Sequence, residues 1–232
     1  MKTFIWGLIG AVLFGAVAAS AAAPSGSGNT VGLISKVIQD VSHKQIDKDW
    51  QKAQKGEPLT SGDRVKTGER SIAIIKFLDN SLVRVRELSE LAVSGKKEGE
   101  AFLKSVDLQN GVVGFSIQKQ RPQEEFRFSS PTSVASIRGT GGLFATSDSS
   151  DTLIVIEGTV NFTNKLTGQS VDVHSGYTGI FGPNGTLQYR PATRTEIMTA
   201  EDAAGNGSLK KLELDLRDNQ GKSKRLHIDI KE

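Results

Sequence analysis

Three histidines, His43, His174 and His227, are the residues that most readily support metal binding or acid–base catalysis. They are too far apart to form a ligand motif such as His-Glu-x-x-His, and each falls in a polar position of an expected strand or loop. We therefore expect three solvated histidines and no metal site. The chain has no cysteine, which excludes a disulfide framework, a thiolate metal site and a cysteine nucleophile.

Serine and acidic residues give no catalytic pattern either. Ser-x-x-Lys occurs at Ser94, Ser116 and Ser208. No Ser-Asp-Asn is present and Lys66-Thr67-Gly68 comes before these sites, so they are chance matches. Two carboxylates are all that a glycosidase needs, and Asp148 and Asp151 stand in a Ser-rich segment that also suits weak calcium binding. We expect a solvated hairpin tip there, and we predict no enzyme and no cofactor.

Arg138 and Glu157 are the charges that the sequence singles out, because each lies in an apolar strand pattern beside a glycine. If their strands are neighbours, the two side chains satisfy each other where either alone is costly to bury. We expect a structural ion pair within a structural motif made of Arg138, Gly139, Thr140, Glu157 and Gly158. The glycines after Arg138 lack the spacing of a nucleotide-binding loop, so no nucleotide is expected.

Short strands must position these residues. Period-2 alternation recurs in residues 82–86, 125–128, 159–162 and 170–173, as half-buried strands require. Residues 72–75 and 153–156 are apolar throughout and are expected to be covered on both faces. Turn signals such as Asn110-Gly111 separate the runs. This spacing, with almost no helical pattern, predicts an all-β domain of β-solenoid or sandwich-like type.

The beginning of the chain predicts export. Lys2 precedes a charge-free apolar run and a small-residue zone, which is the order of a secretory signal peptide. We expect cleavage, because Ala19-Ser20-Ala21 fits the small-residue rule; an uncleaved membrane anchor is the alternative, since residues 4–23 are just long enough to span a bilayer. The predicted organisation is a signal peptide over 1–23, a flexible lead over 24–30, an all-β domain over 31–192, a linker or short helix over 193–208 and a β-hairpin over 209–232.

The predicted hairpin alternates with unusual regularity. Its first strand carries Leu212, Leu214 and Leu216 on one face, its second carries Leu226, Ile228 and Ile230 on one face, and charged residues occupy the opposite faces. A hairpin alone is marginal in water, so its apolar face must dock on this domain or on another chain. The formal net charge is only +3, with both signs interspersed, which gives no reason to expect a nucleic-acid partner.

Three blocks of residues resemble the FecR family. The first runs from Trp50 through Gly62-Asp63 and Thr67-Gly68 to Leu82, the second from Pro131 to Arg138-Gly139-Thr140, and the third is Val155-Ile156-Glu157-Gly158-Thr159-Val160. The blocks come in the family's order over residues 31 to about 180, so this stretch is similar to a FecR-type domain. The resemblance implies an all-β, extracytoplasmic, non-catalytic domain, solenoid-like in architecture.

In FecR regulators this domain follows a cytoplasmic anti-sigma segment and one membrane span, and it relays a signal from an outer-membrane receptor. Only Met1 to Thr3 precede the apolar segment in this sequence. We therefore expect a stand-alone exported form that lacks the anti-sigma segment and the relay role.

The leading hypothesis is a periplasmic or secreted protein-binding or scaffolding module of the bacterial envelope. Its terminal hairpin would pair with an envelope protein or with another copy. The first alternative is a carbohydrate- or cell-wall-binding protein, with or without hydrolysis, although only Trp50, Tyr177, Tyr189 and the remaining Phe residues are available to stack on a sugar once the signal segment is removed. The second is a self-associating structural surface protein. Membrane contact is expected only if the signal segment stays uncleaved.

Overall fold

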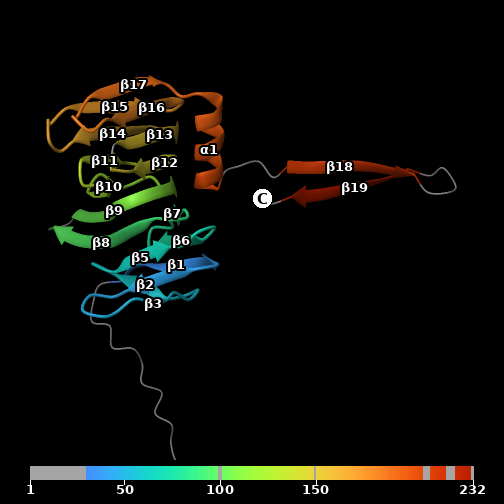
Figure 1. The fold of residues 1–232 in the computed structure, drawn as a ribbon, viewed down its shortest axis with the longest axis horizontal. Helices are drawn as coiled ribbons and strands as arrows, with labels where there is room; N and C mark the ends of the chain where they lie inside the picture. Colours follow the sequence, from blue (N-terminus) through green and yellow to red (C-terminus); the bar gives the residue numbers. More distant parts are fainter. Residues whose placement is uncertain (1–29, 99–100, 149, 206–209, 218–222, 231–232) are drawn as a thin grey trace, which may run out of the picture.

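The structure is a computed structural model that describes residues 30–98, 101–148, 150–205, 210–217 and 223–230 (Figure 1). The predicted signal peptide over 1–23 and the lead up to residue 29 lie outside the described residues. Strands dominate the described chain, which confirms the all-β prediction, and they form an open sheet. Within the described ranges, no helix has the length and apolar character needed to span a membrane.

Seventeen strands hydrogen-bond into one continuous sheet, whose strands stack row upon row in Figure 1 as two facing ladders. Ladder A contains, in spatial order, β4 (Pro58–Thr60), β1 (Thr30–Ile38), β6 (Ile72–Phe77), β7 (Leu82–Val85), the second part of β9 (Ala101–Ser116), β12 (Gly141–Thr146), β13 (Asp151–Glu157), β16 (Tyr177–Phe181) and β17 (Leu187–Pro191). Ladder B contains β3 (Gln51–Lys52), β2 (Val41–Lys44), β5 (Arg64–Thr67), β8 (Glu90–Glu98), the first part of β9, β10 (Glu124–Ser129), β11 (Ser133–Ile137), β14 (Thr159–Asn164) and β15 (Ser170–His174).

The long strand β9 belongs to both ladders. Up to Asn110 it pairs with β8 and β10 in ladder B, and from Gly111 onward it pairs with β12 in ladder A. Gly111 has a φ of 103°, and a Cβ atom there would lie 2.2 Å from Ser89 Oγ, so the bend between the two parts requires glycine. The Asn110-Gly111 pair therefore bends a continuous strand, and our expectation of a turn at this position was wrong.

A column of phenylalanine rings fills the space between the ladders. The column consists of Phe77, Phe115, Phe126, Phe128, Phe144, Phe162 and Phe181, and each side chain is at most 1% exposed. Neighbouring ring centroids lie 4.6 to 6.2 Å apart. Since the rings come from both ladders, their burial holds the two faces together along the whole stack.

The alternation predicted from sequence is observed, with one correction. Val83 and Val85 point inward and are fully buried, as period-2 patterning requires. The all-apolar run at 72–75 was expected to be covered on both faces, but Ile72 and Ile74 are only half-buried on the outer face. The run at 153–156 has the expected cover over Ile154, because a helix packs there.

That helix is α1 (Arg194–Ala204), which lies on the outer face of ladder A (Figure 1). Its Ala200 and Ala203 pack against Leu143 and Ile154. The approach is so close that a Cβ atom at Gly114 would lie 2.0 Å from the Ala203 carbonyl oxygen. Small residues on both elements therefore fix the position of α1, within the stretch predicted as a linker or short helix.

The last two strands, β18 (Lys210–Arg217) and β19 (Ser223–Ile230), form a separate antiparallel pair. Leu212 lies opposite Ile228 and Leu214 opposite Leu226, so the register places the even-numbered positions on one face, as the alternation predicted. The predicted linker residues 206–208, the turn at 218–222 and residues 231–232 lie outside the described residues.

The phenylalanine column gives a stability prediction. Phe128 is fully buried and contacts the rings of Phe115, Phe126 and Phe144. Replacing it in Phe128→Ala removes these contacts and leaves a cavity, which should lower the free energy of unfolding by about 3–5 kcal/mol. Urea unfolding of purified protein measures the change. Leu166→Ala is the control, because Leu166 is 70% exposed and its truncation should change stability by less than about 0.5 kcal/mol.

Candidate functional site

The described histidines take two different positions. His174 is exposed and lies 3.1 Å from the Thr159 hydroxyl, as expected of a solvated histidine. His43 was expected to be solvated too, but it is only 3% exposed. Its Nδ1 is 2.9 Å from a Glu57 oxygen and its Nε2 is 3.3 Å from a buried Asp63 oxygen. The side chain of His227 lies outside the described residues, and within them no group of three or more His, Asp or Glu residues could hold a metal ion.

The two aspartates of the Ser-rich segment also differ. Asp148 is exposed, as expected for a hairpin tip, whereas Asp151 is fully buried, which corrects our expectation of solvation. The Asp151 carboxylate accepts hydrogen bonds from the hydroxyls of Ser130 (2.6 Å), Thr146 (2.5 Å) and Thr132. These donors satisfy the buried carboxylate, so it ties the turn before β11 to the turn before β13.

Arg138 and Glu157 are not a buried ion pair, because both side chains are exposed. Arg138 follows Ile137, whose strand pairs with β10 and β14, so it lies over ladder B beside Glu125. Glu157 lies opposite Gly141 in ladder A. The sequence pattern failed here because β11 and β13 end at a corner, where a residue beside a glycine leaves the core.

The glycines of the two blocks are what the structure brings together. A Cβ atom on Gly158 would lie 2.6 Å from Thr140 Cγ2 and 3.0 Å from the Gly139 carbonyl oxygen. Gly139 and Gly158 both have positive φ, 99° and 81°. The chain crosses from one ladder to the other at each of these corners. The predicted structural motif therefore joins stacked corners through Gly139, Thr140 and Gly158, and its two charges take no part in the contact.

The outer face of ladder B carries a straight row of polar side chains, which we call the polar file. In register across six strands, its members are Ser94, Ser105, Arg127, Ser136, Asn161 and Asp172. The three serines are half-buried and the other three residues are exposed. Helix α1 packs on ladder A, so it leaves the polar file open to solvent. This file presents hydrogen-bonding side chains across six adjacent strands.

Hydrogen bonds order the polar file along its length. The hydroxyls of Ser94 and Ser105 are 2.7 Å apart, and Asn161 Nδ2 donates to Asp172 Oδ1 at 2.7 Å. Arg127 donates two hydrogen bonds to Glu125, at 2.9 and 2.7 Å. Burial raises the pKa of Glu125, but hydrogen bonds from Arg127 and Ser136 and the charge of Arg138 outweigh it and leave this pKa below its ordinary value. Glu125 therefore stays ionised at neutral pH, bonded to Arg127 and close to the charge of Arg138.

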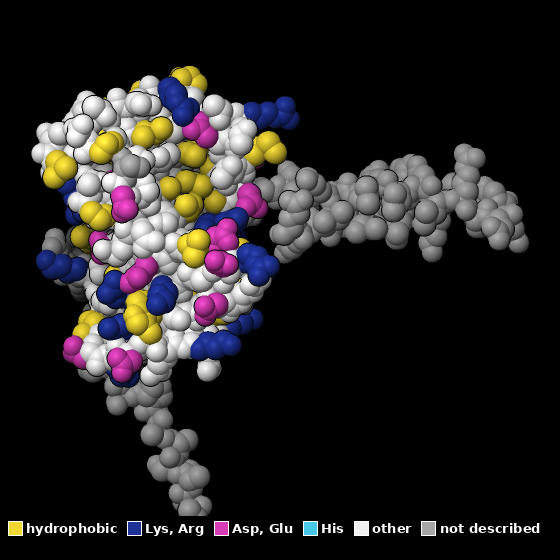
Figure 2. Space-filling model, viewed as in Figure 1, with side chains coloured by type: hydrophobic (Ala, Val, Ile, Leu, Met, Phe, Trp, Pro, Cys, Tyr) yellow, Lys and Arg dark blue, Asp and Glu magenta, His cyan; other side chains and the backbone are white. Residues whose placement is uncertain are grey.

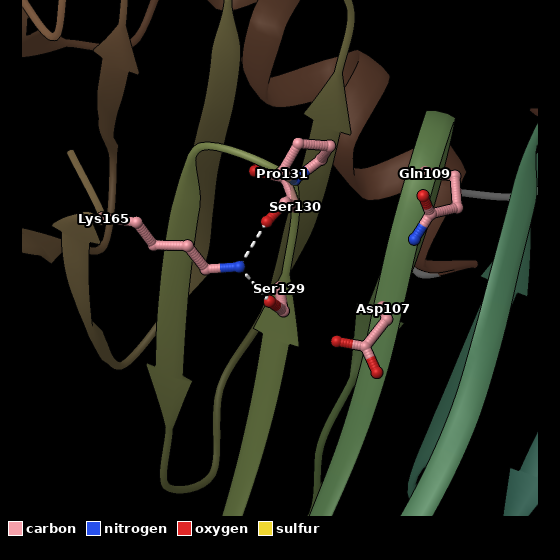
Figure 3. A pocket seen from close by; sticks show the side chains of 6 residues that line it. All are labelled: Asp107, Gln109, Ser129, Ser130, Pro131 and Lys165. Atoms are coloured by element: carbon pink, nitrogen blue, oxygen red, sulfur yellow. Dashed lines mark hydrogen bonds between the residues drawn. The ribbon is translucent and has the colours of Figure 1, made fainter. Parts of the chain in front are cut away.

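Two hollows flank the polar file. One, of about 250 Å³, is lined by residues including Leu103, Glu125 and Arg138. The other, of about 280 Å³, lies between Asp107 on β9 and Lys165 after β14. Figure 3 shows the Lys165 ammonium group pointing toward Ser129 and Ser130, with Asp107 on the neighbouring strand. Each hollow thus offers both a cation and a carboxylate.

The second hollow contains a serine and a lysine in contact. Lys165 Nζ donates to Ser129 Oγ at 2.7 Å and also to the Ser130 carbonyl oxygen. A lysine activates a serine only when it is desolvated and neutral. Lys165 is exposed, so this pair lacks the environment of a serine–lysine catalytic dyad and is suited to hydrogen bonding.

Ion pairs anchor α1, which is the last element before the terminal hairpin in the chain. At the first turn, Arg190 donates two hydrogen bonds to Glu196, at 2.9 and 2.8 Å. At the last turn, Arg84 donates to the Ala204 carbonyl oxygen and Arg86 lies 3.0 Å from Asp202. Both cations lie at the negative end of the helix dipole, Arg84 on a carbonyl group and Arg86 on a carboxylate, which is the favourable arrangement.

Charges of both signs are interspersed over the body in the view of Figure 2, without a large area of one sign. This distribution gives no electrostatic footprint for nucleic acid. The geometry defines a class, a two-ladder all-β domain with stacked glycine corners and an open polar face.

A family model matches part of the chain. Residues 63–161 match the model described as "FecR protein", so this stretch is similar to a FecR-type domain. The match contains the second and third resemblance blocks completely and begins at the Asp63 of the first. No curated protein matches the chain.

One solved structure shares the fold at low identity, and two further structures give weaker alignments. A proposed anti-sigma factor from Parabacteroides distasonis ATCC 8503 aligns with a TM-score of 0.51 and 12% identity, over 66% of this chain and 67% of that one. A second structure under the same description has a TM-score of 0.49 and 10% identity, over 62% and 74%. A cell surface anchoring domain has a TM-score of 0.28 and 27% identity, over 29% and 88%. The first likeness concerns the fold alone.

The stacked corners give a second prediction. Gly158→Ala adds a methyl group that meets Thr140 and the Gly139 carbonyl, in addition to forcing alanine into positive φ. Gly168→Ala is the matched control, since Gly168 has a φ of 70° but no atom within 4 Å of its added Cβ. Both variants force alanine into the left-handed region, which lowers the free energy of unfolding. Gly158→Ala should lower it by about 1–3 kcal/mol more, because its methyl group overpacks the corner. Equal urea midpoints for the two variants would contradict the stacked-corner contact.

The Arg190–Glu196 pair gives a pH prediction. Hydrogen bonds from Arg190, opposed by burial and aided by Thr193, lower the pKa of Glu196 from 4.5 to about 2. Because the folded pKa lies below the unfolded one, the stabilisation is present above pH 4.5 and disappears as the pH falls to 2. Glu196→Gln keeps the capping-box geometry without the charge. The stability difference between wild type and Glu196→Gln, measured by urea unfolding, should shrink over this pH range; a difference that stays constant is incompatible with the assignment.

Proposed function

We propose that this chain is an exported, non-catalytic module of the bacterial envelope that binds a protein through its terminal hairpin. The observation that carries the proposal is the register of β18 and β19, which aligns Leu212 with Ile228 and Leu214 with Leu226 in a sheet separate from the ladders. A two-stranded hairpin needs a third strand or a packing surface for stability. A partner's sheet or groove supplies that surface.

The helix that precedes the hairpin is held firmly on the sheet, which supports a binding role. Helix α1 is held at both ends by ion pairs and lies against Gly114 in the middle of ladder A. The hairpin begins six residues after the end of α1, so a firmly docked element precedes it in the chain. A FecR-type domain of solenoid-like architecture is a suitable rigid scaffold for such presentation. The export expected from the signal-like segment would bring the module to the periplasm or the cell surface.

Affinity capture from the native envelope tests this function. Leu214→Asp and Leu226→Asp place charge at directly opposed positions of the apolar face and should abolish capture of the partner. Asp215→Ala with Arg225→Ala alters an opposed pair on the other face and is the matched control, which should retain capture. The captured protein, once purified, should bind the wild type and the control but neither aspartate variant; binding by all four chains would refute a hairpin contact.

A further inference from the structure

The outer face of ladder B has features of a second binding surface, independent of the hairpin. Protein interfaces concentrate aromatic and aliphatic anchors in their centre. The centre of this face holds the polar file, in which each neighbour along the row is again a hydroxyl, amide, guanidinium or carboxylate group. Such a surface matches a ligand that is itself rich in hydrogen-bonding groups.

The polar file is periodic. Its six members come from adjacent strands, and adjacent strands are separated by about 4.8 Å, so the file is about 24 Å long. This spacing is close to the rise of one sugar unit in an extended β-1,4-linked glycan. A glycan chain lying perpendicular to the strands would therefore meet one polar side chain with each successive sugar.

The side chains retain hydrogen-bonding capacity for such a ligand. Ser94 and Ser105 share one hydrogen bond and Ser105 also donates toward Asp107 at 3.5 Å, which leaves acceptor sites on both hydroxyls. Asn161 and Asp172 share another, which leaves one amide hydrogen of Asn161 and acceptor sites on Asp172 for sugar hydroxyls. Asn161 and Asp172 are exposed, so a ligand reaches these two side chains without any rearrangement of the fold.

The flanking hollows add room beside the row. The hollow with Arg138 and the hollow with Lys165, of about 250 and 280 Å³, lie on the same outer face as the file. Each is large enough for a substituent on a sugar ring, such as an N-acetyl group. Their paired charges offer hydrogen-bond donors and acceptors without selecting strongly for one sign of charge.

We propose that the outer face of ladder B binds an extended β-1,4-linked polysaccharide laid across the strands, with one sugar unit over each member of the polar file. The contact is made by hydrogen bonds rather than by stacking on aromatic rings. Individual sugars therefore bind weakly, and affinity accumulates with the number of strands that the chain crosses. The ligand class is that of structural glycans of cell walls.

Titration with oligosaccharides of increasing length tests the proposal. Chito-oligosaccharides and cello-oligosaccharides share the β-1,4 backbone and differ in the N-acetyl group, so the pair shows whether the hollows recognise the substituent. Malto-oligosaccharides, which are α-1,4-linked and curved, serve as the negative control. Affinity for at least one β-1,4 series should rise with length and level off at about five or six units, the span of the file. Affinity that is independent of length, or equal for malto-oligosaccharides, overturns the proposal.

Variants locate the contact. Asn161→Ala removes an exposed amide from the file and should weaken hexasaccharide binding about fivefold, as loss of one hydrogen bond implies. Asp172→Ala should have a comparable effect, since its carboxylate is also exposed. Thr195→Ala, on the exposed surface of α1, is the control and should bind as the wild type does. Unchanged binding by both file variants, with unfolding midpoints equal to wild type, places the glycan elsewhere and rejects this site.

A truncated chain distinguishes a failure of the glycan site from a failure of the hairpin function. A chain ending at Ser208 lacks both hairpin strands but keeps the whole polar file, so it should bind the hexasaccharide with wild-type affinity. Loss of protein capture with retained glycan binding would separate the two surfaces. Loss of glycan binding in this truncated chain would show that the file does not act alone and would overturn the site as proposed.

Discussion

The packing of phenylalanine rings between two facing ladders is the interaction on which the rest of the structure depends. The rings of ladder B, Phe126, Phe128 and Phe162, come from strands that also turn a member of the polar file outward, so the same alternation builds the core and the file. Phe128 and Phe126 lie inward on β10 while Arg127 lies outward between them. The packing of the core therefore fixes the positions of the outer side chains. The strand register that aligns the core residues also sets the spacing of the polar side chains on the surface.

The two outer faces take different roles because their residues differ. Ladder A presents Leu143 and Ile154, which require a cover and receive α1. Ladder B presents serine, asparagine and charged residues at the equivalent places, which need none. The asymmetry divides the molecule into a supporting side that carries the hairpin and an open side available to solvent-borne ligands.

Sequence alternation predicted the strands well because period 2 is a local property, and the FecR blocks predicted the family. The failures all involve partners distant in the chain. Asp151 looks like a loop aspartate until Ser130 and Thr146 are placed around it, and His43 looks solvated until Glu57 and Asp63 close over it. The polar file had no sequence signal, since alternation marks Ser105 or Asn161 as outward but does not say which strand lies next to which. The sequence pattern drew attention to Arg138 and Glu157 rather than to the glycines beside them. The close contact lies at Gly139 and Gly158, because these residues have no Cβ atom.

Strand β9 has a consequence for what can fold alone. Its first part belongs to ladder B and its second part to ladder A. It therefore pairs with two strands that come before it in the chain, β7 and β8, and with two that come after it, β10 and β12. The family match starts at Asp63 and ends at Asn161, yet β6 within it pairs with β1, and β13 pairs with β16. The strand pairing consequently extends beyond the matched stretch at both ends, and a 63–161 fragment would have unpaired sheet edges there, which favour aggregation.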